Sequence, residues 1–228
     1  MRFLLCLLLF VTIGFSQTKP LIMKHADSLA AMKRSGYLLL KGYVHFVHDS
    51  VQFKTMRATW NRNADIVQCE GDFLFTHPNG FIKAKSGIYQ KRIEFASASG
   101  NVVAKDSLGE YAFFGERLQY DRIKKILTMP LRPVLHHYSK NKDKNGEIDT
   151  LSIKADWISY KQDDEFAEAF KNVVLEHNGM TVTCDTGYFN KKENWISMKG
   201  NPKCLLENHE LSGDSIFLRL TPDGKGLK

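Results

Sequence analysis

The stretch Ile82–Ala104 reads IKAKSGIYQKRIEFASASGNVVA and shows the unit from which most of the chain is built. It places a small residue, Ala84, five positions before an aromatic residue, Tyr89, and continues through a polar turn and an alternating segment into Gly-Asn-Val. The small residue recurs in this setting at Ala26, Thr55, Ala84, Gly115, Ala155, Cys184 and Gly213 (or Ser212). The successive spacings are 29, 29, 31, 40, 29 and 29 residues. A period near 29 over seven copies predicts a repeat architecture, in which each unit contacts mainly its neighbours.

Apolar and polar residues alternate through each unit, which predicts strands rather than helices. The position two residues before the small residue is apolar in the last six copies: Phe53, Ile82, Phe113, Ile153, Val182 and Leu211. A linking glycine recurs at Gly42, Gly71, Gly100 and Gly200, and Lys171-Asn172-Val173 stands in its place once. Because a glycine inside a strand permits a bend, we expect bent strands with one apolar and one polar face.

Each unit supplies two strands and too little apolar surface to fold alone, so the copies must stack, as two sheets with their apolar faces toward each other. Several positions on the inner face are small: Ala84, Ala96, Ala98, Gly100, Ala104 and Gly115. Either neighbouring aromatic side chains fill this space, or the sheets splay around an apolar groove suited to acyl chains. The sequence leaves both interpretations open.

Turn residues separate the strands. Asn178-Gly179 between two alternating apolar segments is the strongest hairpin signal. The fourth unit is lengthened by a polar loop, Lys140–Asp149, which can project without breaking the stack. Ser28–Arg34 is the only helix candidate, and we interpret it as a first strand and turn because the Ala26-Asp27 pair before it is in register with the repeat.

Residues 1–16 are typical of a secretory signal peptide, with Arg2, an apolar run at Phe3–Val11 and the small-x-small pattern Gly14-Phe15-Ser16. The apolar run is shorter than the ~20 residues that span a bilayer. We therefore expect an exported chain with a single elongated domain at 17–220, which carries the polar insertion at 140–149, and a flexible tail at 221–228. Of the 228 residues, 43% are hydrophobic, which is enough for a core.

The formal net charge is +7, or +6 once Arg2 leaves with the signal peptide. This surplus favours acidic or phosphorylated partners, although the lysines and arginines are scattered, as on an ordinary solvated surface. Removal of the signal peptide leaves Cys69, Cys184 and Cys204. Their spacing fits no zinc site, so they are either buried apolar fillers or, for Cys184 and Cys204, a disulfide.

Around the small residues the chain resembles a known family. Ala84-Lys85-Ser86-Gly87-Ile88-Tyr89, Ala155-Asp156-Trp157-Ile158-Ser159-Tyr160 and Cys184-Asp185-Thr186-Gly187-Tyr188 are similar to the Ala-Asp-x-x-x-Tyr signature of OstA-like proteins, the LptA-type periplasmic family of lipopolysaccharide transport. Gly100-Asn101-Val102 and Lys171-Asn172-Val173 match the Gly-Asn-Val that follows it, and the resemblance covers about residues 24–218. It implies an all-β, elongated antiparallel β-taco or β-jellyroll whose subunits join end to end. The chain departs from the pattern at Thr55, at Gly115 and at Leu131-Arg132-Pro133-Val134, where the inward residue is either Val134 or Leu135.

Enzymatic function finds little support in the residues. His45 and His48 are three apart on a strand and so face opposite ways, as do adjacent His136 and His137, which disfavours shared metal ligation. We interpret the histidines as polar surface residues. The sequence contains no Ser/His/Asp elbow, phosphate loop or HExxH motif. We predict no catalytic residue, metal or cofactor.

The apolar inner faces indicate a non-catalytic carrier with acyl chains in a groove, and the resemblance implies that this carrier is a periplasmic lipopolysaccharide-binding transport protein. The predicted lipid-binding residues are Phe46, Phe53, Phe73, Phe75, Ile82, Val102, Phe113, Ile153, Val173, Leu175 and Val182. The expected partners are lipopolysaccharide, other envelope transport proteins joined by strand addition at the edges near Ala26 and Phe217, and possible further copies of the chain, with no nucleic acid. Two alternatives remain, a structural or adhesive β-solenoid with a filled core and an exported polysaccharide-active hydrolase.

Overall fold

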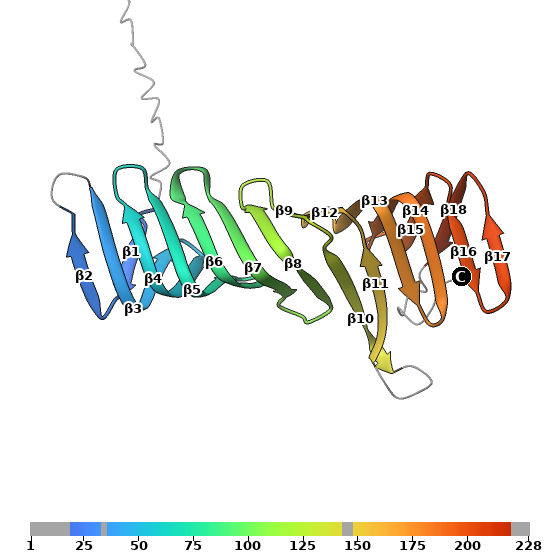
Figure 1. The fold of residues 1–228 in the computed structure, drawn as a ribbon, viewed down its shortest axis with the longest axis horizontal. Helices are drawn as coiled ribbons and strands as arrows, with labels where there is room; N and C mark the ends of the chain where they lie inside the picture. Colours follow the sequence, from blue (N-terminus) through green and yellow to red (C-terminus); the bar gives the residue numbers. More distant parts are fainter. Residues whose placement is uncertain (1–18, 33–35, 143–147, 220–228) are drawn as a thin grey trace, which may run out of the picture.

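The computed structural model describes residues 19–32, 36–142 and 148–219. The predicted signal peptide and the predicted tail fall outside these ranges. The described chain is an elongated antiparallel β structure, with the first strands at one end and the last strands at the other (Figure 1). Within the described ranges no helix is long and apolar enough to cross a membrane. The helical segment there is the three-residue η1 (Lys91–Ile93).

The described residues form eighteen strands. Eight are long, with 11 or 12 residues each, and run through both sheets: β3 (Tyr37–His48), β4 (Val51–Asn61), β5 (Ile66–His77), β6 (Gly80–Gln90), β7 (Phe95–Asp106), β8 (Tyr111–Asp121), β13 (Phe166–His177) and β14 (Met180–Asn190). The remaining ten are shorter: β1 (Ile22–His25), β2 (Ser28–Ala31), β9 (Ile126–Pro130), β10 (Val134–Lys142), β11 (Ile148–Lys154), β12 (Trp157–Lys161), β15 (Trp195–Lys199), β16 (Lys203–Leu206), β17 (His209–Ser212) and β18 (Ser215–Arg219).

The pairings divide the strands into two facing sheets. Sheet 1 contains β2, β9, β12, β15, β18 and one half of every long strand, and sheet 2 contains β1, β10, β11, β16, β17 and the other halves. Successive short strands, such as β9 and β10, therefore correspond to one long strand interrupted at the bend. This is the all-β, antiparallel fold that the sequence predicts.

The bends lie at the linking glycines. Gly100 and Asn101 both have positive φ, +83° and +48°, and the β7–β8 register shifts between Ser99 and Val102. Left-handed backbone is easiest for glycine and is tolerated by asparagine, which explains the Gly-Asn signature. In the fourth unit Leu131 and Arg132 take the same conformation, with φ of +68° and +57°, although neither residue favours it.

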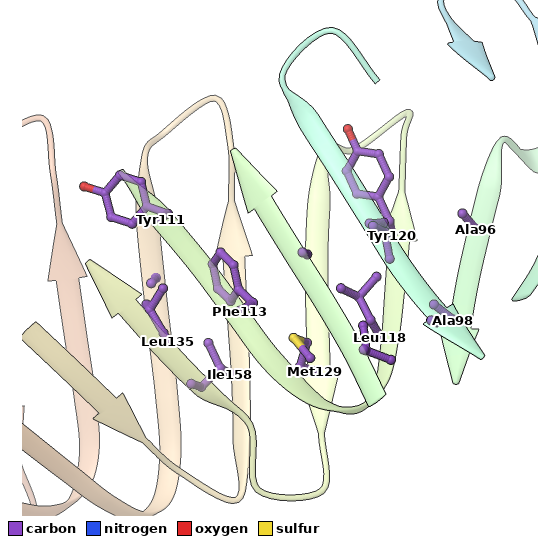
Figure 2. Packing of buried hydrophobic residues seen from close by; sticks show 14 of the residues in the cluster. Ala96, Ala98, Tyr111, Phe113, Leu118, Tyr120, Met129, Leu135 and Ile158 are labelled. Atoms are coloured by element: carbon purple, nitrogen blue, oxygen red, sulfur yellow. The ribbon is translucent and has the colours of Figure 1, made fainter. Parts of the chain in front are cut away.

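The interior between the sheets is one continuous apolar core. It contains the inward residues of every long strand, among them Phe46, Phe53 and Tyr89, each at most 1% exposed. Figure 2 labels the side chains of Ala96, Ala98, Tyr111, Phe113, Leu118, Tyr120, Met129, Leu135 and Ile158, which come from β7, β8, β9, β10 and β12. The fourth-unit register is thereby settled, because Leu135 is buried at 2% exposure and Val134 is only half-buried.

The local turn predictions have clear outcomes. Asn178 and Gly179, with φ of +46° and +79°, form the two-residue turn between β13 and β14. Ser28–Ala31 is strand β2 rather than a helix. The hairpin of β10 and β11 projects from the body where the polar insertion was expected, and its residues 143–147 lie outside the described ranges (Figure 1).

Candidate functional site

The interior between the two sheets is the candidate site. All eleven residues predicted to contact lipid point into it and are at most 6% exposed: Phe46, Phe53, Phe73, Phe75, Ile82, Val102, Phe113, Ile153, Val173, Leu175 and Val182. They come from both halves of the molecule, which makes the apolar lining continuous along the stack. Their contact with a lipid remains a prediction.

The space beside two small inward residues, Gly87 and Gly115, is filled by neighbouring side chains. A Cβ atom added at Gly87 would lie 2.4 Å from two ring atoms of Phe73, and one at Gly115 would lie 2.9 Å from the methyl carbon of Met129. Aromatic rings also stack along the core, for example Phe46 on Phe53 with centroids 5.1 Å apart. Neighbouring side chains therefore fill the space at these two glycines, whereas Ala104, another of the small inward residues, borders a cavity.

Cavities between the described residues interrupt this packing. One of about 10 Å³ lies in the C-terminal half, beside Leu175 and Met198. The larger, of about 80 Å³, lies in the middle of the molecule and is lined by Phe75, His77, Asn79, Gly80, Phe81, Ile82, Ala104, Lys105, Asp106 and Phe113 from sheet 2 and its turns, and by Tyr120, Lys125, Leu127, Tyr160 and Gln162 from sheet 1 and its turns. We call it the central cavity.

The turns that connect the strands of the two sheets approach each other on the side opposite the bends. Rim 1 consists of the turns of sheet 1, at 62–65, 91–94, 122–125, 162–165 and 191–194, and rim 2 of the described turns of sheet 2, at 49–50, 78–79, 107–110, 178–179 and 207–208. The line along which the rims meet is the seam. Backbone hydrogen bonds connect successive turns of rim 1, such as the one from the Arg122 N–H to the Glu94 carbonyl at 3.1 Å.

Arg122 joins the rims on one side of the central cavity. Its guanidinium lies 3.0 Å from Glu94 on its own rim and 3.5 Å from Asp49 on rim 2, and it donates to the Ser50 hydroxyl at 3.3 Å. The Arg122 side chain is only 6% exposed, which makes this ion-pair cluster more than a surface contact. It also donates to the Tyr89 hydroxyl at 3.2 Å. We call this set clasp 1.

Lys191 joins the rims on the other side. Its Nζ lies 3.0 Å from the Glu110 carboxylate of rim 2 and 4.9 Å from the centroid of the Tyr111 ring. The Glu110 side chain is 16% exposed and that of Lys191 31% exposed, so the pair is partly screened from water. We call this contact clasp 2. Sequence analysis did not find either clasp, because each joins residues far apart in the chain.

Burial shifts the pKa of several groups near the seam. It lowers the pKa of His48, whose Nδ1 lies 2.6 Å from the Tyr89 hydroxyl, and raises the pKa of Tyr89 to about 12. It also lowers the pKa of His77, with Arg122 and Lys125 adding to the effect. A neutral His48 can accept a hydrogen bond from Tyr89 and donate one to the Lys19 carbonyl, 3.1 Å away.

Two expectations about polar residues have different outcomes. His45 and His48 do lie on opposite faces, since His45 contacts Gln52 outside and His48 is inside. The interpretation of the histidines as surface residues is wrong for His48, which is 3% exposed because it pairs with Tyr89 across the interior. Within the described ranges no cluster of three or more His, Cys, Asp or Glu side chains could hold a metal ion.

The cysteines and the acidic signature residues have structural environments. Cys69, Cys184 and Cys204 are buried and free. Asp156, the acid of the Ala-Asp signature in the fifth copy, accepts a hydrogen bond from the Asn172 side chain at 2.9 Å, at the outer side of a bend. This links the two halves of the sequence signature, the Ala-Asp pair and the Asn that precedes Val, in one contact.

No protein-family model and no curated protein matches the sequence. Among solved structures, the chain is similar to the crystal structure of LptH, the LptA homologous periplasmic component of the conserved lipopolysaccharide transport device from Pseudomonas aeruginosa. The TM-score is 0.44 and the identity 17%, over 58% of this chain and 94% of that chain. Since this similarity is weak, the function of the chain has to be inferred from its own residues and geometry.

Proposed function

We propose that this chain is a non-catalytic lipopolysaccharide-binding transport protein of the periplasm, which carries the acyl chains of the glycolipid between its two sheets toward the outer membrane. The observation that supports the proposal most is the continuous apolar lining of the interior, which extends from Phe46 in β3 to Val182 in β14. The OstA-like signatures at the bends of the same strands support it independently.

The closed interior sets a condition on how lipid binds. The central cavity of about 80 Å³ is about half the size of the ~150 Å³ engineered cavity that takes up benzene, so an acyl chain is admitted only if the sheets separate at the seam. Each buried CH₂ contributes about 0.8 kcal/mol, and ten of them contribute about 8 kcal/mol. This gain offsets the loss of contacts between facing side chains, whose places the chain takes.

The repeat explains how a bound lipid could move. Equivalent inward positions carry apolar residues in successive units, such as Phe75 in β5 and Ala104 in β7, and Leu175 in β13 occupies the same position in a later unit. A chain that shifts by one unit therefore exchanges one apolar environment for another at small cost. The carrier needs no catalytic group for this step.

The two ends provide edges for assembly. In the described part of the chain β1 and β2 pair only with β3, and β17 and β18 pair only with β16 and β15. Large apolar residues are exposed there, including Leu29 at 50% and Phe217 at 55%. Leu211 faces inward opposite Cys204 but is 60% exposed because nothing in the described chain covers the end. Strand addition of a second copy or of a transport partner would cover these edges.

The test is to purify the exported chain, extract it with organic solvent and analyse the extract by mass spectrometry. We expect co-purified glycolipid. A photoreactive phenylalanine analogue at Phe73, inside, should cross-link to that lipid, and the same analogue at Lys85, exposed on the outer face of the neighbouring strand, should not. Phe73→Asp should weaken lipid binding more than Lys85→Asp.

A structural or adhesive β-solenoid is the second candidate, and the filled space at Gly87 favours it. It predicts a chain that purifies without lipid and shows no cross-link from position 73. Equal effects of Phe73→Asp and Lys85→Asp on lipid binding would likewise refute the inward assignment on which the carrier proposal depends.

A further inference from the structure

The central cavity lies between the two clasps along the seam. On rim 2 its residues His77 and Asn79 belong to the turn between the one that carries Asp49 and the one that carries Glu110. On rim 1 Lys125 and Gln162 lie between Arg122 and Lys191. On both rims, therefore, the cavity lies between clasp 1 and clasp 2.

The floor of the cavity is apolar and comes from both sheets. Phe75, Ile82 and Phe113 of sheet 2 face Tyr120 and Tyr160 of sheet 1. The Phe75 and Tyr120 rings are 6.4 Å apart and the Phe113 and Tyr160 rings 5.8 Å apart, so aromatic pairs meet across the space. This floor is continuous with the lining of the candidate site, since Phe75, Ile82 and Phe113 belong to both.

Two lysines lie at the outer margin of the cavity. Lys105 from β7 and Lys125 from rim 1 both line it and are exposed. Lys125 has a partner in Asp163, 2.8 Å away, with the side chains 49% and 59% exposed. Lys105 has no ion-pair partner among the described residues. Asp106 also lines the cavity, and its carboxylate accepts a hydrogen bond from the Tyr111 N–H at 2.8 Å rather than pairing with either lysine.

Two exposed lysines beside an apolar floor match an anionic amphiphile, whose charged group can contact Lys105, which has no ion-pair partner in the described chain, and compete with Asp163 for Lys125 while its alkyl chain is buried. We propose that the central cavity is a lateral port through which one acyl chain of an anionic amphiphile enters the interior, with the anionic group held between Lys105 and Lys125. This rests on the proposed carrier function and specifies where along the seam the lipid is loaded. The clasps hold the rims together on either side, so separation of the sheets begins at the port.

The test uses dodecyl phosphate below its micelle concentration as the probe, titrated by calorimetry into the full exported chain. The double variant Lys105→Glu/Lys125→Glu changes only exposed residues and should weaken binding by roughly ten-fold or more at low salt, with a smaller effect in 0.5 M salt. The matched control is Lys54→Glu/Lys85→Glu, which makes the same charge change at exposed positions of β4 and β6 that do not line the cavity. It should leave binding within two-fold of wild type.

Neutral dodecyl maltoside and inorganic phosphate complete the design. We expect the maltoside to bind more weakly than dodecyl phosphate and equally to all three chains, and inorganic phosphate alone to bind far more weakly than dodecyl phosphate. If both double variants weaken dodecyl phosphate binding equally, or neither does, the port is refuted while the carrier proposal stands. If the wild-type chain binds neither alkyl compound, the carrier proposal fails as well.

The order of contact gives a second measurement that does not depend on charge. A photoreactive analogue at Leu127, which lines the port, should cross-link to a radiolabelled alkyl phosphate earlier in a time course than one at Leu218, which packs on the core next to the C-terminal edge. Cross-linking that reaches position 218 first would show that lipid enters from the end of the stack, and would overturn the port.

Discussion

Gly87→Ala tests most directly whether the interior is closed. The added Cβ would lie 2.4 Å from the Cδ1 and Cε1 atoms of Phe73 and 2.6 Å from its Cζ, and the ring is itself 1% exposed with packed neighbours. Overpacking of this kind costs about 1–3 kcal/mol. Replacing glycine by alanine also reduces the conformational entropy of the unfolded chain, which stabilises the folded chain by about 0.4–1 kcal/mol. We expect a net decrease of about 1–2 kcal/mol in the free energy of unfolding.

The repeat supplies a matched control at the equivalent position of a later copy. A Cβ added at Gly187 would lie 3.2 Å from the Val173 Cγ1 and 3.5 Å from the Met198 sulfur, which small shifts can accommodate. Gly187→Ala should therefore be neutral or stabilising by up to about 1 kcal/mol. The two substitutions are chemically identical and differ only in what occupies the space, since Phe73 in one unit corresponds to Val173 in the other.

Urea unfolding of the two variants and wild type, followed by circular dichroism, gives the comparison. In a Phe73→Val background, which reproduces the later unit, Gly87→Ala should lower the free energy of unfolding much less than it does in the wild-type chain. The difference between these two changes is the coupling energy of positions 73 and 87. A Gly87→Ala chain as stable as wild type would refute the reasoning. It would mean that the Phe73 side chain can shift and that the interior can accommodate a lipid without a large cost in stability.

Four further predictions follow from individual contacts. Thr55→Val should lower the free energy of unfolding by about 1–3 kcal/mol and Thr55→Ser by much less, because the Thr55 hydroxyl lies 2.8 Å from the Gly71 carbonyl and 3.0 Å from the Glu70 carbonyl in a buried bend; urea titration measures both. Native Cys69 should resist alkylation in a mass-spectrometric time course, because its burial raises the pKa of the thiol; fast labelling without denaturant would contradict this. Arg122→Gln should lower stability yet speed the uptake of dodecyl phosphate in stopped-flow measurements, whereas Arg57→Gln, at an exposed pair, should change neither; an unchanged uptake rate in Arg122→Gln would show that clasp 1 does not hold the seam. Since burial lowers the pKa of His48 below its ordinary value of 6.5, the unfolded chain binds more protons below that pH; stability should be full above about pH 6.5 and fall on acidification, with a shallower dependence in His48→Gln, and an identical slope in that variant would argue against the assignment.

The face of each strand and the positions of the bends could be predicted from sequence because both depend on local rules. Alternation fixes which residues point inward, and all eleven predicted inward residues are buried. The glycines mark bends because they relieve left-handed backbone, as at Gly100. Leu131 and Arg132 adopt the same conformation without a residue that favours it, and for that reason the fourth unit could not be placed in register from sequence alone.

The state of the interior and the contacts along the seam could not be predicted in the same way. Whether Phe73 fills the space at Gly87 depends on the distance between neighbouring strands and on a rotamer, neither of which appears in a pattern of residue types. Arg122 contacts Asp49 because turns of opposite sheets meet, and the two residues are 73 positions apart. The only sequence signal was a charged residue in a turn, which is common on any surface.

The bends also determine how such a body could open. At Gly100 and Asn101 the ladder between β7 and β8 is interrupted, so that the pairs up to Ser99 belong to sheet 1 and the pairs from Val102 belong to sheet 2. A change in the angle between the sheets can therefore be absorbed by residues that make no ladder pairs there. The hydrogen bonds within each sheet need not break, and the cost falls on the facing side chains and on the clasps at the seam. A bound acyl chain replaces the contacts between facing side chains, but it does not replace the ion pairs of the clasps. The loss of the clasps is therefore the part of the cost that the bound lipid does not offset.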